Sequence, residues 1–403
     1  MISVEEALER INQHATTRAP RMIRSVDSLG LVLAADIKSD IDSPPHDKAL
    51  MDGYAVVASD IVPGVELTIL EEVTAGDVPT KPVTAGTATR IMTGAPIPDG
   101  ADAVVMVERT EVVGNNGTTV RIDFDAAQPG LNIMPRGESV REGDVVLRSG
   151  RLIRPIEMGV LAECGATEIA AYKRPSVAIL STGNELVPPE KRPNAGQIRN
   201  SNGPMLKALV QRAGSDAVNL GVGRDERADL DRLVQRGLEE DVLVLSGGVS
   251  AGVLDLVPEV LASNGVEQVF HKVHLKPGKP VWFGIKQDPR GDRLVFGLPG
   301  NPVSSLVCFE LFVRPALASL AGQAFGNVER RTACLATTHS RYSDRPTYFP
   351  ARLFERDGQP QVEPLAWKGS ADLRTLADAN CLALFPPSEN EFAAGVVIEV
   401  FLI

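Results

Sequence analysis

Residues 242–255, Val-Leu-Val-Leu-Ser-Gly-Gly-Val-Ser-Ala-Gly-Val-Leu-Asp, constrain the fold more than any other stretch of this chain. The run 242–245 is aliphatic at every position, which is typical of a strand buried on both faces of a parallel sheet. The run stops at Ser246, and Gly247 and Gly248 let the backbone turn sharply and approach a ligand closely. This pattern predicts a strand that ends at a binding loop.

The loop after this strand offers groups that suit an anion. Ser246 and Ser250 carry hydroxyls, and the free N–H groups of a glycine turn can face a phosphate. Asp255 adds a carboxylate just beyond, which suggests a phosphorylated substrate together with a metal cation. An ordinary tight turn between a strand and a helix explains the same residues, and the pattern alone leaves both interpretations open.

Strands and helices alternate around this stretch, which predicts a parallel α/β domain. Ligands of such sheets bind outside the carboxyl ends of the strands, so the turns that begin at Ser181, Ser246 and Gly297 should meet at one cleft. The expected strands are 177–180, 242–245 and 294–296, and the expected helices are 202–213, 227–238, 255–263 and 302–320.

The rest of the chain is richer in β-type segments. Short runs of β-formers separated by Gly, Pro and Asp occupy 23–173, with a short helix expected at 152–164, and a further β-rich segment follows residue 326. An N-terminal helix is expected at 3–12, with Ser3 as its N-cap.

Composition excludes several classes of partner. The 403 residues argue for several domains, and the net charge is −11 with no long basic run. This charge argues against nucleic acid or an anionic membrane as a partner, and the aromatic content of 4% argues against nucleic-acid binding by stacking. No apolar run long enough for a membrane span and no secretory signal are visible, so we expect a cytoplasmic protein.

A lysine-rich turn, Leu-Lys-Pro-Gly-Lys-Pro, occupies 275–280. Lys276 and Lys279 are stiffened by two prolines, and Lys272 lies four residues upstream of Lys276. Such ammonium groups could hold a phosphate or an oxyanion. A solvated basic turn is the alternative.

The segment 297–305, Gly-Leu-Pro-Gly-Asn-Pro-Val-Ser-Ser, resembles a ligand loop that opens a helix. Asn301 fits the N-cap and Pro302 the first turn, and helix N-termini favour anions. Pro299, Gly300 and Ser304 belong to the same segment, for which an ordinary capped helix start is the alternative.

Carboxylates and amides follow the first strand. Glu185 is a candidate second carboxylate for the cleft, and the amide-rich run 197–202 could read a polar heterocycle. Turn chemistry before a helix is the alternative for both, and Asp225 has the same two interpretations, a cleft carboxylate or an N-cap. Asp52 and Thr93, in Met-Asp-Gly-Tyr at 51–54 and Ile-Met-Thr-Gly at 91–94, would be called structural if taken alone.

Seven segments in the same order resemble the MoeA family, the molybdopterin molybdenumtransferases, which also includes the gephyrin E domain. They are MDGYAV at 51–56, IMTGAP at 91–96, RPSVAILSTGNEL at 174–186, GQIRNSN at 196–202, SGGVS at 246–250 with Asp255, KPGKP at 276–280 and GLPGNPVSS at 297–305. Each is weak alone, but together they cover nearly the whole chain.

The resemblance implies an elongated homodimer with the active site between subunits and four domains in each. The domains would be a linker and dimerisation domain (23–45 and 139–173), a β-rich domain (46–138), an α/β molybdopterin-binding domain similar to molybdopterin adenylyltransferase (1–22 and 174–325), and a C-terminal β domain (326–403). The implied reaction inserts molybdenum from molybdate into adenylylated molybdopterin and releases AMP, with Mg²⁺. An adenylyltransferase could hand over the substrate.

The resemblance also implies roles for single residues. Asp225 and Asp255, together with Glu185, would serve the nucleotide and the metal. Lys272, Lys276 and Lys279 would hold phosphate or molybdate, and Pro299 and Pro302 would shape the pocket wall. Asp52 and Thr93 resemble positions that the partner subunit contributes. Arg352 and Ser370 are plausible matches to an oxyanion site.

One departure from the family pattern concerns a carboxylate. The family usually has Gly-Glu-Asp where this chain has Gly137-Glu138-Ser139, and Glu138 or Asp144 could compensate. A non-catalytic or weakened paralogue that acts as a pterin-binding scaffold on the same fold is therefore the alternative function.

Overall fold

The structure of the chain is a computed structural model that describes residues 1–403 except 115, 249–255, 326–329, 341 and 389–390. It divides into two compact units. The first consists of Met1–Met22, Gly30–Ala34 and Ala170–Ile403, and the second of Ile23–Leu29 and Ala35–Ile169. The finer division into four domains stays a prediction.

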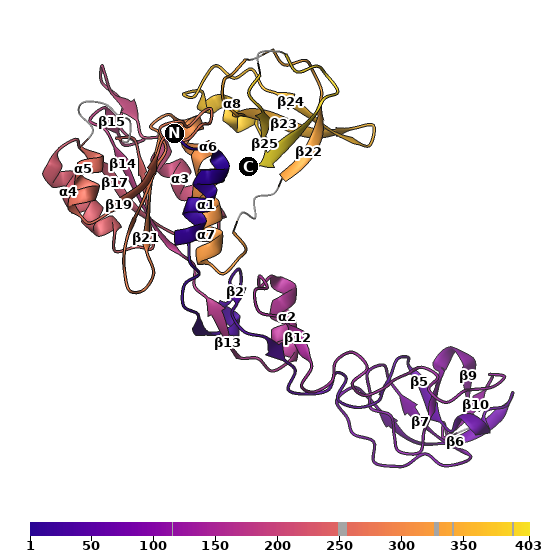
Figure 1. Cartoon of the computed structure of the whole chain (residues 1–403). Helices are drawn as coiled ribbons and strands as arrows, with labels where there is room; N and C mark the ends of the chain where they lie inside the picture. Colours follow the sequence, from indigo (N-terminus) through magenta and orange to yellow (C-terminus); the bar gives the residue numbers. More distant parts are fainter. Residues whose placement is uncertain (115, 249–255, 326–329, 341, 389–390) are drawn as a thin grey trace. The chain divides into compact units, whose positions relative to one another are not determined.

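The first unit is built on a six-stranded sheet in the order β17-β14-β18-β21-β20-β19 (Figure 1). Neighbouring pairs among the first four strands are parallel, as the sequence predicts, whereas β20 and β19 are antiparallel. The strands are β14 (Ser176–Thr182), β17 (Asp216–Gly223), β18 (Val242–Ser246), β19 (Glu267–His271), β20 (Trp282–Lys286) and β21 (Arg293–Leu298).

Three of these strands were not predicted, and their patterns show why. β17 carries Asn219 and Gly221 and pairs with β14 through an irregular register, so it lacks a continuous apolar run. β19 and β20 lie at the other side of the sheet, where β19 contains polar residues and β20 is interrupted by Gly284. Strands of this kind give a weaker signal than the aliphatic runs of central strands.

The expected helices of this unit are confirmed to within a few residues. Ser3 caps the first by accepting a hydrogen bond from the backbone N–H of Glu6 at 3.0 Å, and Glu6 itself accepts from Arg10. The last predicted helix contains a π-helical turn over Phe309–Val313 between two α-helical parts. The helices are α1 (Val4–His14), α3 (Asn202–Arg212), α4 (Arg227–Gly237), α5 (Val257–Ser263), α6 (Pro302–Cys308) and α7 (Arg314–Leu320).

Helices cover both faces of the sheet, as the alternation along β14 shows. Val177 and Ile179 belong to the core that α1, α3, α6 and α7 share, whereas Ala178 and Leu180 pack in the core under α4 and α5 (Figure 1). Because side chains alternate across a strand, an all-apolar strand fills both cores. Each fully buried large aliphatic side chain contributes about 1.5–3 kcal/mol.

The C-terminal segment of the first unit closes a five-stranded barrel in the order β22-β24-β23-β25-β26. Phe349, Trp367 and Phe385 lie in its interior, and the same continuous core includes the sheet face under α6. Gly395, at a φ of +86°, makes the turn before the last strand. The elements are β22 (Arg330–Leu335), β23 (Thr347–Arg356), β24 (Gln359–Pro364), α8 (Leu373–Asp378), β25 (Cys381–Phe385) and β26 (Val397–Leu402).

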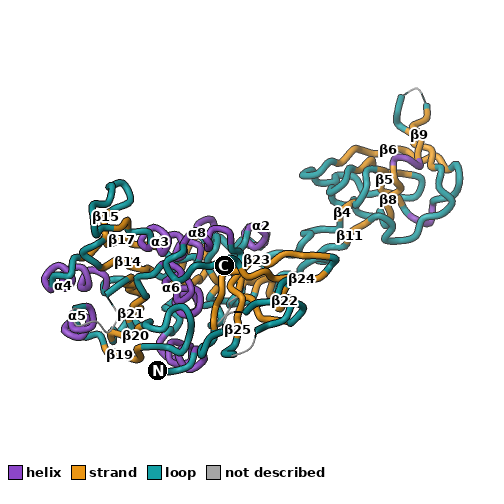
Figure 2. Tube along the Cα trace, turned by 90° about the horizontal axis from the view of Figure 1, so that it is seen from above, coloured by secondary structure: helices purple, strands orange, loops and turns teal. Residues whose placement is uncertain are grey.

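The second unit is dominated by short strands and long loops (Figure 2). Its main sheet has the order β8-β5-β7-β6-β10-β9 and encloses Tyr54, Leu67 and Val105. The strands are β5 (Gly53–Val56), β6 (Val65–Val73), β7 (Thr87–Ile91), β8 (Ala103–Met106), β9 (Thr110–Val113) and β10 (Thr119–Ile122), and its α-helix is α2 (Pro155–Glu163).

The remaining strands of the chain are short. They are β1 (Arg21–Arg24), β2 (Val32–Leu33), β3 (Ile37–Lys38), β4 (Lys48–Ala49), β11 (Ile133–Met134), β12 (Val145–Leu147), β13 (Glu168–Tyr172), β15 (Leu186–Val187) and β16 (Ile198–Arg199).

Across the described ranges, one helical stretch, Pro302–Leu320, is long and apolar enough to cross a membrane by length and composition. It spans α6, the π-helical turn and α7, and 83% of its most apolar window is buried inside the structure. Its apolar composition is therefore that of a core helix.

Candidate active site

The carboxyl ends of β14, β18 and β21 open into one polar cavity of about 680 Å³. Ser181, Ser246 and Leu298 are in register across the three strands, so the turns that follow them meet there. The structure thus confirms that these turns converge, and we call this space the nucleotide cleft after the adenylylated substrate that the sequence resemblance leads us to expect there. Predicted residues that line it are Glu185, Asp225, Ser246, Gly247, Gly248, Gly300, Asn301 and Pro302.

Asn202, at the start of α3, connects two walls of the nucleotide cleft. Its Nδ2 donates to Ser246 Oγ at 2.7 Å and to the carbonyl of Gly300 at 2.8 Å. The Oδ1 of Asn202 is buried and has no hydrogen-bond partner within the described part of the chain. The orientation of the amide is therefore fixed by the two hydrogen bonds that it donates, and its oxygen is enclosed within the protein.

Gly247 is required where the cleft narrows. Its φ is +91°, and a Cβ there would lie 2.6 Å from the carbonyl oxygen of Thr182. Any side chain would therefore force β14 and β18 apart at their ends. The neighbouring Gly248 also has a positive φ, of +63°. Ser250 and Asp255, predicted for the same loop, lie outside the described residues.

Two carboxylates line the nucleotide cleft, those of Glu185 and Asp225. Gly183, at a φ of +144°, leaves room for the Glu185 carboxylate, because a Cβ there would lie 2.5 Å from Oε2. The backbone N–H of Asp225 donates to Asn184 Oδ1 at 3.2 Å. Where side chains are described, no three His, Cys, Asp or Glu gather closely enough to hold a metal ion.

A second cavity, of about 330 Å³, carries both lysines of the turn at 275–280, and we call it the lysine pocket, whereas Arg199 is a cation that lines the nucleotide cleft. Asn301 lines both cavities, so they border each other at the start of α6. There Asn301 Nδ2 donates to Ser370 Oγ at 2.9 Å, and the N–H of Val303 donates to the carbonyl of Ser370 at 3.1 Å. Predicted residues that line the lysine pocket are Lys276, Lys279, Pro299, Asn301, Ser304 and Ser370.

The structure places two predicted cations elsewhere and adds one that was missed. Lys272 and Arg352 line neither cavity, and Arg352 is exposed on β23 opposite Glu363. Arg345 lines the lysine pocket instead, with Nη1 donating to the carbonyl of Leu275 at 3.3 Å. Local sequence offered no signal for Arg345, because the two residues of that contact lie 70 positions apart.

Asp52 and Thr93 meet in the second unit. Both the backbone N–H and the hydroxyl of Thr93 donate to Asp52 Oδ1, at 2.7 and 2.6 Å. The hydroxyl and then the N–H hold the pKa of the Asp52 carboxyl below its usual range. The two residues therefore form a defined anionic unit, and its use by a partner subunit stays a prediction.

The segment around Ser139 has a carboxylate that the sequence analysis did not single out. Asp42 accepts from Arg136 Nε at 2.5 Å and from the backbone N–H of Glu142 at 2.9 Å, and it lies against Gly137. The backbone N–H of Glu142 and the Arg136 side chain lower the pKa of Asp42. Asp42 is thus a third acid near this segment, besides Glu138 and Asp144.

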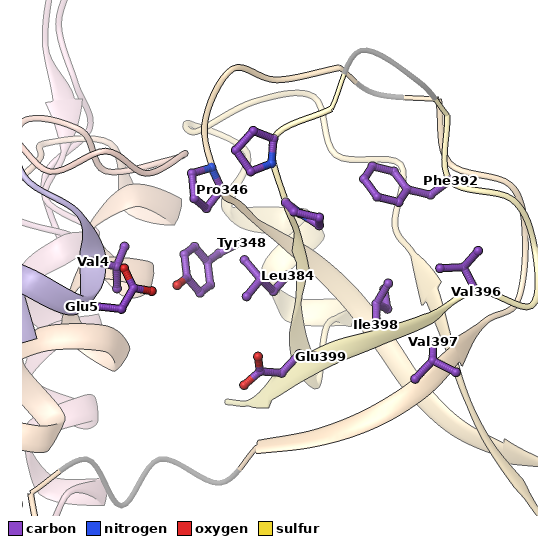
Figure 3. Close-up of a pocket in the computed structure, with 12 residues that line it drawn as sticks. Val4, Glu5, Pro346, Tyr348, Leu384, Phe392, Val396, Val397, Ile398 and Glu399 are labelled. Atoms are coloured by element: carbon purple, nitrogen blue, oxygen red, sulfur yellow. The ribbon is translucent and has the colours of Figure 1, made fainter.

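A third cavity, of about 370 Å³, lies between the start of α1 and the barrel (Figure 3). Val4 faces Tyr348 and Leu384 there, and the charged groups that line the cavity are the carboxylates of Glu5 and Glu399. Among the residues that the structure describes, no lysine or arginine lines this cavity, so it does not suit an anionic substrate as the lysine pocket does.

Comparison with known families agrees with this geometry along the chain. Residues 2–165 match the MoeA N-terminal region (domain I and II), 178–319 match a probable molybdopterin binding domain, and 332–403 match the MoeA C-terminal region (domain IV). Together with the polar cleft, the matches define a transferase of molybdenum cofactor biosynthesis. The chain belongs to the MoeA family, as its relatives show.

Those relatives match over almost their full length. Proteins named molybdopterin molybdenumtransferase from Staphylococcus aureus (strain Mu50) and Staphylococcus epidermidis (strain RP62A) are 34% and 33% identical, each over 100% of this chain and 95% of the relative. Among solved structures, a molybdopterin biosynthesis MoeA protein from Pyrococcus horikoshii superposes with a TM-score of 0.83 at 31% identity, covering 100% of this chain and 99% of that one.

Proposed function

We propose that this chain inserts molybdenum from molybdate into adenylylated molybdopterin and releases AMP. The observation that carries the proposal is the border between the two cavities at Asn301. The nucleotide cleft offers backbone and amide groups at the ends of three strands, and the lysine pocket next to it offers three cations. An adenylylated substrate and an oxyanion could therefore be held side by side.

The nucleotide cleft suits the phosphates and the ring systems of the substrate. The turn at Gly247 and Gly248 lets the backbone approach a phosphoanhydride, and the amide and hydroxyl residues 200–202 line the same cleft, where such groups can hydrogen-bond a heterocycle. The start of α6, at Pro302, faces the same space, and a helix N-terminus stabilises negative charge.

The lysine pocket suits a tetrahedral dianion. Lys276, Lys279 and Arg345 supply positive charge, and Ser304 and Ser370 supply hydroxyls. Charge-assisted hydrogen bonds of this kind are roughly twice as strong as neutral ones. Insertion would then depend on holding the two reactants in line and on stabilising charge at the phosphoanhydride that is cleaved, rather than on a covalent intermediate.

Magnesium is part of this proposal. Glu185 and Asp225 both line the nucleotide cleft, and hard carboxylate oxygens beside a phosphate site are the donors that Mg²⁺ takes. When bound, the ion would neutralise phosphate charge. Asp255, the third predicted ligand, follows the turn at Gly248 in the sequence.

We also propose that the chain acts as a homodimer. Supporting observations come from the second unit, where the 3₁₀ turn Ser25–Asp27 contacts α2. Val26 is 69% exposed and Ile156 71% exposed, with Leu29 and Leu152 also exposed. A group of exposed large apolar residues on neighbouring elements is typical of an interaction surface.

The direct test is incubation of the purified full-length chain with adenylylated molybdopterin, molybdate and Mg²⁺. We expect AMP and metallated cofactor to form together, and Asp225→Asn to slow both. Tight substrate binding by the wild type without AMP release would overturn the proposal in favour of a scaffold. A matched control is Asp216→Asn, because Asp216 is exposed at the opposite, amino-terminal end of the sheet, where β17 begins.

A further inference from the structure

Cys308 lies directly under the loop that carries the two lysines of the lysine pocket. A Cβ built on Gly278 would lie 2.5 Å from the Cys308 sulfur, well inside van der Waals contact. Cys308 is completely buried, and its sulfur is 3.6 Å from the carbonyl oxygen of Gly278. The sulfur therefore supports the backbone of the loop at its central residue.

Backbone hydrogen bonds also hold this loop. The carbonyl of Gly278 also accepts from the backbone N–H of Val281 at 3.0 Å, which closes the turn itself. At its start, the N–H of Lys276 donates to the carbonyl of Pro346 at 2.9 Å. The carbonyls of Lys279 and Lys276 accept from backbone N–H groups outside the turn. The Cys308 contact differs from these bonds because it comes from a side chain of α6 and reaches the central Gly278.

α6 contributes to the lysine pocket in two ways. Ser304 lines the pocket, and Cys308 follows it by four residues, so both lie on the same face of the helix. One rigid helix face therefore presents a hydroxyl to the pocket and a sulfur to the loop. Any change in the sulfur should alter the distance between the loop and Ser304.

We propose that Cys308 is a positioning residue that sets the place of Lys276 and Lys279 in the lysine pocket through its contact with Gly278. This inference rests on the proposed oxyanion role of that pocket. Its chemistry is steric and hydrogen-bonding: the sulfur fills the space that the missing Cβ of Gly278 leaves, and the S–H group points at a carbonyl.

The protonation state of the thiol agrees with this role. Burial raises the pKa of the Cys308 thiol, so the group keeps its proton and stays a donor rather than a nucleophile.

The chain contains a matched control for this residue. Cys381 is also completely buried, and its sulfur is 3.4 Å from the carbonyl of Ala351 inside the barrel. Truncation of either cysteine to alanine removes one buried sulfur and one weak S–H donor. A merely structural role would give the two variants similar effects on both stability and ligand binding.

The experiment measures binding of molybdate alone to the full-length protein by isothermal titration calorimetry. We expect Cys308→Ala to weaken molybdate binding about fivefold, while Cys381→Ala leaves it unchanged. Cys308→Ser, which keeps a small donor, should bind more tightly than Cys308→Ala. In the assay, Cys308→Ala should raise the KM for molybdate and leave the KM for the adenylylated substrate unchanged.

A double-variant cycle tests the contact itself. Gly278→Ala should weaken molybdate binding because the new Cβ meets the sulfur and because φ is +119° there. Gly278→Ala combined with Cys308→Ala should lose less than the product of the two single losses, because the steric conflict is gone.

The outcomes distinguish the proposed oxyanion role of the lysine pocket from the positioning role of Cys308. Failure of Lys276→Ala and Lys279→Ala to weaken molybdate binding would overturn the oxyanion role, and the inference with it. If the lysine variants weaken molybdate binding but Cys308→Ala behaves like Cys381→Ala, the inference alone is wrong. It is also wrong if the loss of affinity in the double variant equals the product of the two single losses.

Discussion

Asn202 Nδ2 lies 2.7 Å from Ser246 Oγ, so the first residue of α3 is hydrogen-bonded to the last residue of β18. The same nitrogen binds the carbonyl of Gly300. One amide thus joins the glycine-bearing loop that follows β18 to the one that follows β21. The shape of the cleft depends on this side chain.

Asn202→Asp should therefore damage the nucleotide side of the site. The carboxylate cannot donate to the Gly300 carbonyl and adds negative charge where an anion binds. We expect the KM for adenylylated molybdopterin to rise about tenfold to a hundredfold, since an unsatisfied buried polar group costs about 1–3 kcal/mol. Steady-state kinetics with molybdate held at saturation measures this change.

Asn264 provides the control for that variant. Its Nδ2 also makes two hydrogen bonds, to Asp231 Oδ1 at 2.7 Å and to the carbonyl of Val260 at 2.8 Å, at the end of α5. Asn264→Asp should lower stability and leave the KM unchanged. Equal KM values for Asn202→Asp and the wild type would contradict the assigned role of Asn202.

The two barrel arginines can be told apart by kinetics. Arg345 lines the lysine pocket, whereas Arg352 lies opposite Glu363 on the outside of β23. Arg345→Ala should raise the KM for molybdate about tenfold, because a charge-assisted contact contributes about 1.5–3 kcal/mol. A larger effect of Arg352→Ala than of Arg345→Ala would restore the original sequence-based assignment.

The Thr93 hydroxyl is the largest cause of the depressed pKa of Asp52, so Thr93→Val should raise that pKa toward its ordinary range. A carboxyl whose pKa is lowered by folding stabilises the folded state above its unfolded pKa, about 3.9, and the benefit disappears as pH falls through the folded value. Thr93→Val should hence be less stable than the wild type at neutral pH, and equally stable in strong acid.

A carbon-detected NMR titration of the Asp52 carboxyl measures the shift. Thr74→Val is the control, because the Thr74 hydroxyl donates to Asp77 Oδ2 at 2.7 Å and lowers the pKa of that carboxyl in the same unit. Thr74→Val should raise the pKa of Asp77 and leave the pKa of Asp52 unchanged. An unchanged Asp52 pKa in Thr93→Val would show that the backbone N–H of residue 93 alone is enough to keep that pKa low, which would contradict the prediction.

The proposed homodimer predicts that a charge on the exposed apolar group of the second unit separates the subunits. Ile156→Glu should convert a dimer to a monomer, because burying an unpaired carboxylate in an apolar contact is unfavourable. Sedimentation equilibrium gives the mass of each species. Val78→Glu is the control, since Val78 is equally accessible but outside this group. A dimer that survives Ile156→Glu would place the interface elsewhere.

Much of the first unit could be predicted because its signals are local. The aliphatic runs of β14, β18 and β21 predict buried strands, and a turn rich in glycine at the end of each places their ligands at one edge. The nucleotide cleft was therefore predictable down to Ser246, Gly247 and Asn301. Edge strands such as β19 were not predicted, because a strand that is half polar has a sequence similar to that of a loop.

The lysine pocket was decided by tertiary structure. The sequence alone determined that Lys276 and Lys279 lie on a stiff turn, but only barrel closure brings Arg345 and Ser370 against that turn, from positions distant in the chain. The sequence alone also determined that Gly278 is small, but not that the Cys308 sulfur fills the space beside it. Local patterns report backbone preference, whereas contacts between distant segments depend on how the whole core packs.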